Sequence, residues 1–230
     1  MKLLALDTSS VACTVALQLG DKVTERHEEQ PREHTRLLVP MIRSLLEEAK
    51  AELSDLDAIV LGNGPGSFVG MRIAASVAQG LAYASGIRII PISSLAAVAA
   101  QVLAEHDAIE VAVTQDAHMN EVYLGIYARD DSGFPKPLMA ERLHAQAAIA
   151  ELSRSGDGRR FAAGFGWSKY PALLEHNRDR IDQVVDILHP RARYLLTLGA
   201  QALEAGESIV PVDVEPAYLR QKVAQKPAPP

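Results

Sequence analysis

The chain carries the same local plan in both of its halves. In the first half, a short apolar run over 3–6 ends at Asp7, and a small polar turn and a second strand-like run follow. In the second half, the apolar run over 110–113 leads to Asp116, again followed by a short turn and an alternating run. Helical segments follow each copy, so the repeat predicts two similar α/β lobes.

We place the boundary between the two predicted lobes near residue 106. The expected organisation is a first lobe over 1–106, a second lobe over 107–220 and a loose, proline-rich tail over 221–230. Apolar periodicity predicts strands over 3–6, 13–19, 22–28, 58–61, 88–92, 110–113, 121–127 and 161–163, of which the first three form a meander. It predicts helices over 38–49, 68–84, 94–105, 146–152, 172–177 and 192–205, and a polar loop over 153–160. Thr35 is one cap for the first helix, in which Pro40 suits only the first turn.

Asp7 and Asp116 are the first candidates for chemistry. An acidic residue at the end of a central strand, beside the turn Thr8-Ser9-Ser10, can hold a magnesium ion or orient a water near a phosphate. The hydroxyls and amides of that turn could cradle the phosphate. The alternative, that each aspartate only caps its own turn, stays open. Neither turn contains a lysine or arginine, which argues against strong catalysis.

A glycine-rich turn lies between an expected strand and the helix over 68–84. Such a turn can bind an anion at a helix N-terminus, and its glycines are Gly62, Gly64, Gly66 and Gly70. It lacks the Gly-Lys-Ser/Thr of a P-loop and the spacing of a dinucleotide site. Glycines that only allow close backbone approach explain it equally well. Ser67 is expected to cap the helix and Gly86 to end it.

That helix has two apolar faces. One face carries Val69, Ile73, Val77 and Leu81. The neighbouring face is made of small residues, with Met71 one turn ahead of them: Ala74, Ala75, Ala78 and Ala82. Small residues let a second helix approach closely, so this face could be a seam between molecules, flanked by Arg72 and Gln79. The alternative is a core helix covered by its own lobe.

Composition and residue types exclude several function classes. The 230 residues are 48% hydrophobic and 23% charged, which excludes a wholly disordered chain, and the net charge of −6 gives no general attraction to nucleic acid. The histidines lack metal-ligand spacing, the lone Cys13 lies in an apolar strand, and no Gly-x-Ser-x-Gly elbow occurs. The aromatic residues Tyr83, Tyr123, Tyr127 and Trp167 are scattered rather than arranged as a base-stacking platform. No apolar run is long enough for a membrane span or a signal peptide, so we expect a cytoplasmic protein.

Four motifs follow one another along the chain. They are Leu4-Ala5-Leu6-Asp7-Thr8-Ser9-Ser10, Gly62-Asn63-Gly64-Pro65-Gly66-Ser67-Phe68-Val69-Gly70-Met71-Arg72-Ile73, Asp116-Ala117-His118-Met119-Asn120-Glu121-Val122-Tyr123 and Pro216-Ala217-Tyr218-Leu219-Arg220. Together they resemble the TsaB family, also called YeaZ, over almost the whole chain. The second motif is the most specific, and the family more often has arginine where this chain has His118.

The resemblance implies the actin-like ATPase (ASKHA) fold, with two tandem ribonuclease-H-like lobes. It also implies a role in making threonylcarbamoyladenosine, the modified base beside the tRNA anticodon. In that pathway one enzyme makes threonylcarbamoyl-adenylate, and TsaD, a paralogue with a metal-binding His-x-x-x-His motif, transfers the group to tRNA. Members of this family are implied to be non-catalytic partners that activate TsaD, joined by the ATPase TsaE. Most contact with tRNA would come through the complex.

The resemblance also implies where partners and ligands bind. The first two helices would pack against TsaD, or against a second copy of this chain when it is alone. The interface residues would be Leu38, Met41, Leu45, Met71, Arg72, Ala74, Ala75, Ala78, Gln79 and Ala82. A vestigial phosphate loop would comprise Asp7, Thr8, Ser9, Ser10, Gly64, Gly66 and Asp116. The isolated chain is expected to hold no metal and no tightly bound cofactor, with ATP or ADP at the junction with TsaD.

One competing hypothesis is an independent ATPase or phosphotransferase that uses Asp7, Thr8 and Ser9 around a nucleotide. It predicts magnesium-dependent ATP binding that Asp7→Asn weakens. A peptidase follows only from older naming in the family, because the chain offers no nucleophile–base set.

Overall fold

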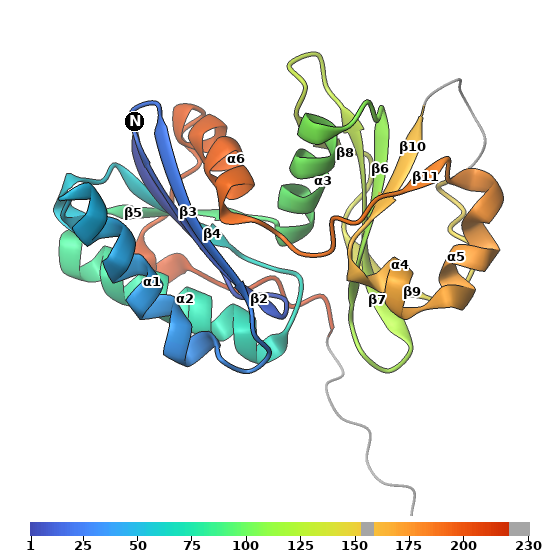
Figure 1. Ribbon diagram of the computed structural model, residues 1–230, viewed down its shortest axis with the longest axis horizontal. Helices are drawn as coiled ribbons and strands as arrows, with labels where there is room; N and C mark the ends of the chain where they lie inside the picture. Colours follow the sequence, from blue (N-terminus) through green and yellow to red (C-terminus); the bar gives the residue numbers. More distant parts are fainter. Residues whose placement is uncertain (153–158, 221–230) are drawn as a thin grey trace, which may run out of the picture.

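The computed structural model describes residues 1–152 and 159–220, whose elements form two β-sheets side by side (Figure 1). The expected tail over 221–230 and most of the polar loop over 153–160 lie outside the described residues. Within the described part, no helix combines the length and the apolar character that a membrane crossing needs.

The first sheet has the strand order β3-β2-β1-β4-β5. Its strands are β1 (Lys2–Asp7), β2 (Ala12–Leu19), β3 (Lys22–Glu29), β4 (Ala58–Gly62) and β5 (Arg88–Ile92). β1 runs antiparallel to β2 and parallel to β4, and β2 runs antiparallel to β3. The predicted opening meander is therefore confirmed.

Helices cover both faces of the first sheet. α1 (His34–Ala49) and α2 (Phe68–Ser85) pack on one face, in a cluster with Leu4 and Leu6. α6 (Ala192–Glu204) packs on the other face, in a cluster with Leu3. This follows from the strand period of two, which sends neighbouring side chains of β1 into different cores.

The predicted limits of α2 are confirmed, and those of α1 are corrected. The Ser67 hydroxyl accepts the Gly70 amide N–H at 3.2 Å, and Gly86 ends α2 with φ 71°. In α1 the cap residue is Glu33, so Thr35 lies inside the helix. Pro40 is also inside, where it lies exposed and removes only one backbone hydrogen bond.

The second sheet repeats the strand–aspartate–turn–strand plan. Its order is β11-β10-β6-β7-β8, with β9 also paired to β7. The strands are β6 (Glu110–Asp116), β7 (Glu121–Arg129), β8 (Pro135–Pro137), β9 (Arg142–Ala145), β10 (Arg160–Ala163) and β11 (Gln183–Val184). α3 (Ser94–Glu105) covers one face, and α4 (Phe165–Lys169) and α5 (Pro171–Asn177) cover the other.

One helix from each half of the sequence packs on the sheet that is formed by the other half (Figure 1). α3 precedes residue 106 but covers the second sheet, whereas α6 follows β11 but covers the first sheet. Each sheet is thus completed by a helix from the other part of the sequence. The division of the chain at residue 106 stays a prediction, and two lobes cut there would each lose a covering helix.

The helix predicted over 146–152 is wrong. The amide N–H of Ile149 donates to the side chain of Asn177 at 2.8 Å, and its carbonyl accepts from Arg180 at 2.6 Å. Because these side chains take the backbone groups, the segment does not bond to itself as a helix. Apolar spacing also missed β8, β9, β11, α4 and the 3₁₀ turns Leu53–Asp55, Arg178–Arg180 and Pro211–Asp213.

The segment over 208–220, here called the strap, joins the two lobes. It starts beside β5, where Ile209 forms a bridge with Ile89, and then runs along α2. Gln79 on α2 donates to the carbonyl of Pro211 at 2.8 Å. At its end, Arg220 donates to the carbonyl of Ala117, in the turn between β6 and β7, at 3.0 Å.

Candidate functional site

The predicted phosphate loop is closed over Asp7, which is fully buried at the end of β1. One carboxylate oxygen accepts the amide N–H of Ser9 at 2.6 Å, and the other accepts the hydroxyl of Ser94. Burial raises the pKa of Asp7 from 3.8 to about 6, against the lowering effect of these hydrogen bonds. Asp7 therefore caps its own turn.

The glycine turn forms the cover over this carboxylate. A Cβ on Gly62 would lie 2.0 Å from Oδ2 of Asp7, and one on Gly70 would lie 1.9 Å from the carbonyl oxygen of Thr8. The Thr8 hydroxyl donates to the Gly70 carbonyl at 2.7 Å, and the Gly64 amide donates to the Ser94 hydroxyl at 3.0 Å. The glycines thus allow close packing, and protein atoms fill the space beside Asp7 that a phosphate would need.

The structure brings only part of the predicted loop to a cavity. Ser9, Ser10 and Asp116 line a cavity of about 620 Å³ between the lobes, which α1 and α2 border at their N-terminal ends. Asp7 and Thr8 lie beneath its surface. The loop therefore does not present the Asp7 carboxylate or the Thr8 hydroxyl to a ligand in this cavity.

Asp116 is held as an anion by its neighbours. Its carboxylate accepts the Tyr170 hydroxyl at 2.7 Å, the His118 amide at 3.0 Å and the Lys169 ammonium at 2.5 Å. Burial alone would raise the pKa of Asp116, but these hydrogen bonds outweigh it and lower the pKa. Like Asp7, it caps its turn.

The turn after Asp116 has an unusual backbone. The three consecutive residues 118–120 have φ between 52° and 61°. Each such non-glycine residue costs roughly 1–2 kcal/mol in the left-handed region. Arg220 of the strap holds this turn through the Ala117 carbonyl and pairs with Glu121 at 2.6 Å.

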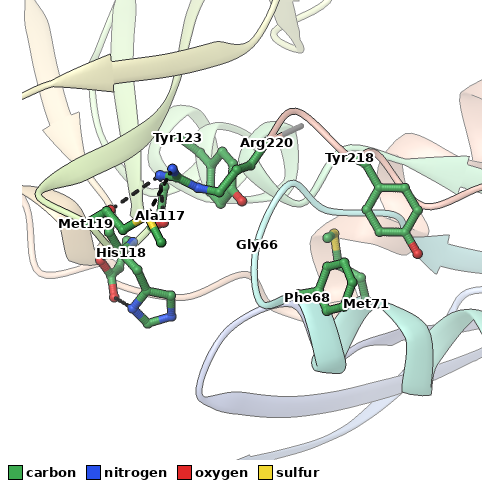
Figure 2. Close-up of a pocket in the computed structure, with 10 residues that line it drawn as sticks. Gly66, Phe68, Met71, Ala117, His118, Met119, Tyr123, Tyr218 and Arg220 are labelled. Carbon is green, nitrogen blue, oxygen red and sulfur yellow. Dashed lines mark hydrogen bonds and ion pairs between the residues drawn. The ribbon is translucent and has the colours of Figure 1, made fainter. Parts of the chain in front are cut away.

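A slot opens between this turn and the first lobe (Figure 2). Met119 lies on one side of it, and Phe68 and Tyr218 lie on the other. These three side chains are 55%, 46% and 43% exposed. We call this cavity of about 340 Å³ the interlobe slot; it is lined by Gly66, Phe68, Met71, Asp116, Ala117, His118, Met119, Tyr123, Tyr218 and Arg220.

A second apolar cavity, of about 630 Å³, lies between α1 and α2. We call it the α1–α2 groove; its lining is Thr35, Leu38, Val39, Phe68, Val69, Arg72, Ile73, Ser76 and Val77. Val69 is 64% exposed and Val39 is 46% exposed. The Arg72 guanidinium lies over the Phe68 ring, 3.2 Å from its centroid, at the rim of the groove.

The alanine face predicted as a seam lies in the interior. Ala74, Ala78 and Ala82 are fully buried and Ala75 is 4% exposed, in the cluster that α2 shares with the first sheet. The other predicted interface residues that are buried are Leu38, Met41, Leu45 and Met71. The small side chains bring α2 close to its own sheet, so this face belongs to the core in the described conformation. The apolar face left partly open is the neighbouring one, over 69–77.

The two polar residues predicted to flank the seam have different positions. Arg72 lines the α1–α2 groove, whereas Gln79 is bonded to the strap. Within residues 1–152 and 159–220, no cluster of His, Cys, Asp or Glu side chains could hold a metal ion. Cys13 is buried, and burial together with the charges of Asp7 and Glu28 raises its pKa to about 12, so its thiol is inert.

The known proteins that this chain resembles share one pathway in their names. Residues 22–228 match the family model described as "TsaD: tRNA N6-adenosine threonylcarbamoyltransferase". The tRNA threonylcarbamoyladenosine biosynthesis protein TsaB of Escherichia coli K12 is 33% identical over 100% of this chain and 99% of its own length. The Haemophilus influenzae protein of the same name is 36% identical over 100% of this chain and 98% of its own.

Solved structures agree with the sequence relatives. YeaZ from Pseudomonas aeruginosa is 36% identical, with a TM-score of 0.85 over 95% of this chain and 99% of its own. A second structure from that organism, of an uncharacterized protein with similarity to peptidase YeaZ, is 37% identical with the same TM-score and coverage. With its two-lobe actin-like α/β fold, the chain belongs to the TsaB (YeaZ) family.

Proposed function

We propose that this chain is a non-catalytic partner that activates TsaD in the synthesis of threonylcarbamoyladenosine in tRNA. The names of its relatives and the TsaD-type family model support the pathway. The α1–α2 groove carries the proposal of docking, because it is the apolar part of two neighbouring helices that the chain leaves uncovered. A helix of TsaD would lie in this groove, with Arg72 at its rim.

The closed loop over Asp7 supports a non-catalytic role. A nucleotide phosphate would have to displace the glycine turn and break the bond between Ser94 and Asp7. The Asp7 carboxylate is also poorly placed to hold magnesium, because it is fully buried and its two oxygens already accept hydrogen bonds from Ser9 and Ser94. Among the described residues, Ser9, Ser10 and Asp116 line a cavity between the lobes, but the Asp7 carboxylate, on which the ATPase hypothesis depends, lies beneath its surface.

The same groove would serve when TsaD is absent. Two copies would pair through it symmetrically as a homodimer, because one self-complementary patch suffices for a two-fold interface. In the assembled complex TsaE would join the pair, ATP or ADP would lie at the junction with TsaD, and TsaD would supply most of the tRNA contact. The enzyme that makes threonylcarbamoyl-adenylate would be linked through the pathway only.

A charge placed in the groove tests the docking proposal. Val69→Asp should weaken binding to TsaD at least tenfold, because an interface would bury an unpaired carboxylate. The control is Val212→Asp, since Val212 is 82% exposed on the strap and lies outside the groove. Isothermal titration with TsaD gives the affinity. Reconstitution with TsaD, TsaE and the adenylate-making enzyme gives the rate of tRNA modification.

The outcomes test the docking site and the role as activator separately. If Val69→Asp binds TsaD as tightly as the unchanged protein, the groove is not the docking site. If tRNA modification proceeds equally well without this chain, the role as activator is wrong. Loss of both binding and activity with Val69→Asp but not with Val212→Asp supports the whole proposal.

A further inference from the structure

We propose that Arg72 decides which partner the α1–α2 groove accepts. Its guanidinium is set to bind a carboxylate on the docked helix of TsaD, and it opposes pairing of the groove with a second copy of this chain, whose groove lining has no carboxylate. The inference rests on the proposed docking of TsaD in this groove. It adds the chemistry that the partner must carry, which is an acidic side chain that meets the rim of the groove at Arg72.

The Arg72 guanidinium is held by two aromatic rings. It lies 3.2 Å from the centroid of the Phe68 ring and 4.9 Å from that of the Tyr218 ring. The two rings come from α2 and from the strap and lie side by side, with centroids 5.8 Å apart (Figure 2). A guanidinium stacked in this way is already restricted before a partner arrives, so its side chain loses less conformational entropy on binding.

The charge of Arg72 is unpaired within the described part of the chain. No carboxylate there lies within ion-pair distance of it, whereas Arg26, for example, pairs with Glu48. Of the five N–H donors of a guanidinium, one is used, by the carbonyl of Phe68 at 3.3 Å. The planar fork of a guanidinium matches a carboxylate with two parallel hydrogen bonds, so Arg72 is suited to an acidic partner.

The surface beside Arg72 is apolar. Val69 is 64% exposed, and Ile73 and Val77 also line the groove. A helix that covers these side chains would also take water away from the guanidinium at the rim. A charge that loses its water without gaining a partner costs free energy, so the docked helix must supply a carboxylate at this point.

A second copy of this chain does not supply that carboxylate from its own groove. None of the residues that line the groove is acidic, and each copy brings its own Arg72. Glu47 of α1 lines a separate cavity, which it shares with Arg43. In a two-fold pair the two grooves face each other, so both guanidinium groups would lose water without an acidic partner from either lining. The same residue thus favours one partner and disfavours the other.

The test measures two affinities for each variant of the whole protein. Sedimentation equilibrium gives the dissociation constant of the homodimer, and isothermal titration gives that of the complex with TsaD. Arg72→Met removes the charge and keeps an unbranched side chain. It should weaken binding to TsaD by roughly tenfold or more and strengthen the homodimer by roughly fivefold or more.

Two further variants separate the charge of Arg72 from its shape. Arg72→Lys keeps the charge and loses the planar fork, so it should weaken binding to TsaD and leave the homodimer as weak as before. Arg178→Met is the matched control, because Arg178 is exposed in a 3₁₀ turn of the second lobe and lies outside the groove. It should change neither affinity.

Opposite shifts of the two affinities with Arg72→Met support the proposal. It is overturned if both affinities shift in the same direction, or if the homodimer is not strengthened. It is also overturned if Arg72→Lys strengthens the homodimer as much as Arg72→Met does, because the effect then comes from shape. If Val69→Asp weakens binding to TsaD and Arg72→Met does not, docking in the groove stands and the carboxylate is wrong. If neither variant weakens it, the groove is not the docking site.

Discussion

Replacing Asp7 by asparagine should make the protein more stable at neutral pH and slightly less stable in acid. The carboxyl group is fully buried, and its pKa is raised from 3.8 to about 6 in the folded state. The folded protein therefore holds the proton more firmly than the unfolded chain does. The contribution of Asp7 to stability is therefore highest below pH 3.8, falls as the pH rises towards 6, and is constant above it.

The size of the effect follows from the two pKa values. A rise from 3.8 to about 6 corresponds to about 3 kcal/mol of lost stability at pH 8. Asparagine carries no charge, so it removes this loss, and its oxygen can still accept the Ser9 amide. The side-chain NH₂ of the asparagine would donate to the Ser94 hydroxyl, which already accepts from the Gly64 amide. The Ser94 hydroxyl would then have no acceptor for its own proton. That mismatch costs about 1 kcal/mol at every pH.

Urea denaturation of both proteins from pH 4 to pH 8, followed by the fluorescence of the buried Trp167, measures the difference. The difference in unfolding free energy should change by about 2.5 kcal/mol between the two ends, from about −0.5 to about +2 kcal/mol for the variant. The exposed Asp21→Asn is the control and should show no such change. A difference that stays flat with pH would refute the reasoning, because Asp7 would then be ionised without penalty in the fold.

Three further substitutions test how α2 packs in the first lobe. Ala78→Glu should cost about 3–5 kcal/mol of stability, because it buries an unpaired charge between α2 and its own sheet; a thermal melt like that of the unchanged protein would contradict this placement. Gly80→Ala should gain about 0.5–1 kcal/mol, since its Cβ meets nothing within 4 Å, whereas Gly70→Ala should lose stability because its Cβ would strike the Thr8 carbonyl. Equal urea midpoints for the two glycine variants would show that the glycine turn is not packed on β1 as described.

Local chemistry made the ends of elements predictable. The Ser67 side chain caps the first turn of α2, and Gly86, which has no Cβ, adopts the left-handed conformation that ends the helix. Both limits of α2 therefore follow from the sequence. The repeat of Asp7 and Asp116 after a buried strand likewise predicts two sheets that open with an antiparallel pair. These features depend on neighbours within a few residues.

Features that depend on distant residues were not predictable in this way. The segment over 146–152 has helical spacing, but Asn177 and Arg180 take the backbone groups of Ile149. The pattern of α2 shows two apolar faces and does not say which one its own sheet covers. The slot was missed because Phe68, Met119 and Tyr218 are far apart in the chain, and only the fold brings them together.

The contacts that hold the start of α2 connect the closed loop over Asp7 with the exposed α1–α2 groove. The start of α2 is fixed on the first strand pair, because the Ser67 amide donates to the carbonyl of Ser9 at 2.6 Å and the Thr8 hydroxyl donates to Gly70. With that side of the first turn facing inward, Phe68 and Val69 face outward. Opening the loop to admit a phosphate would shift the same turn that lines the groove. In this chain, access to Asp7 and an intact α1–α2 groove therefore oppose each other, which favours a partner protein over an enzyme.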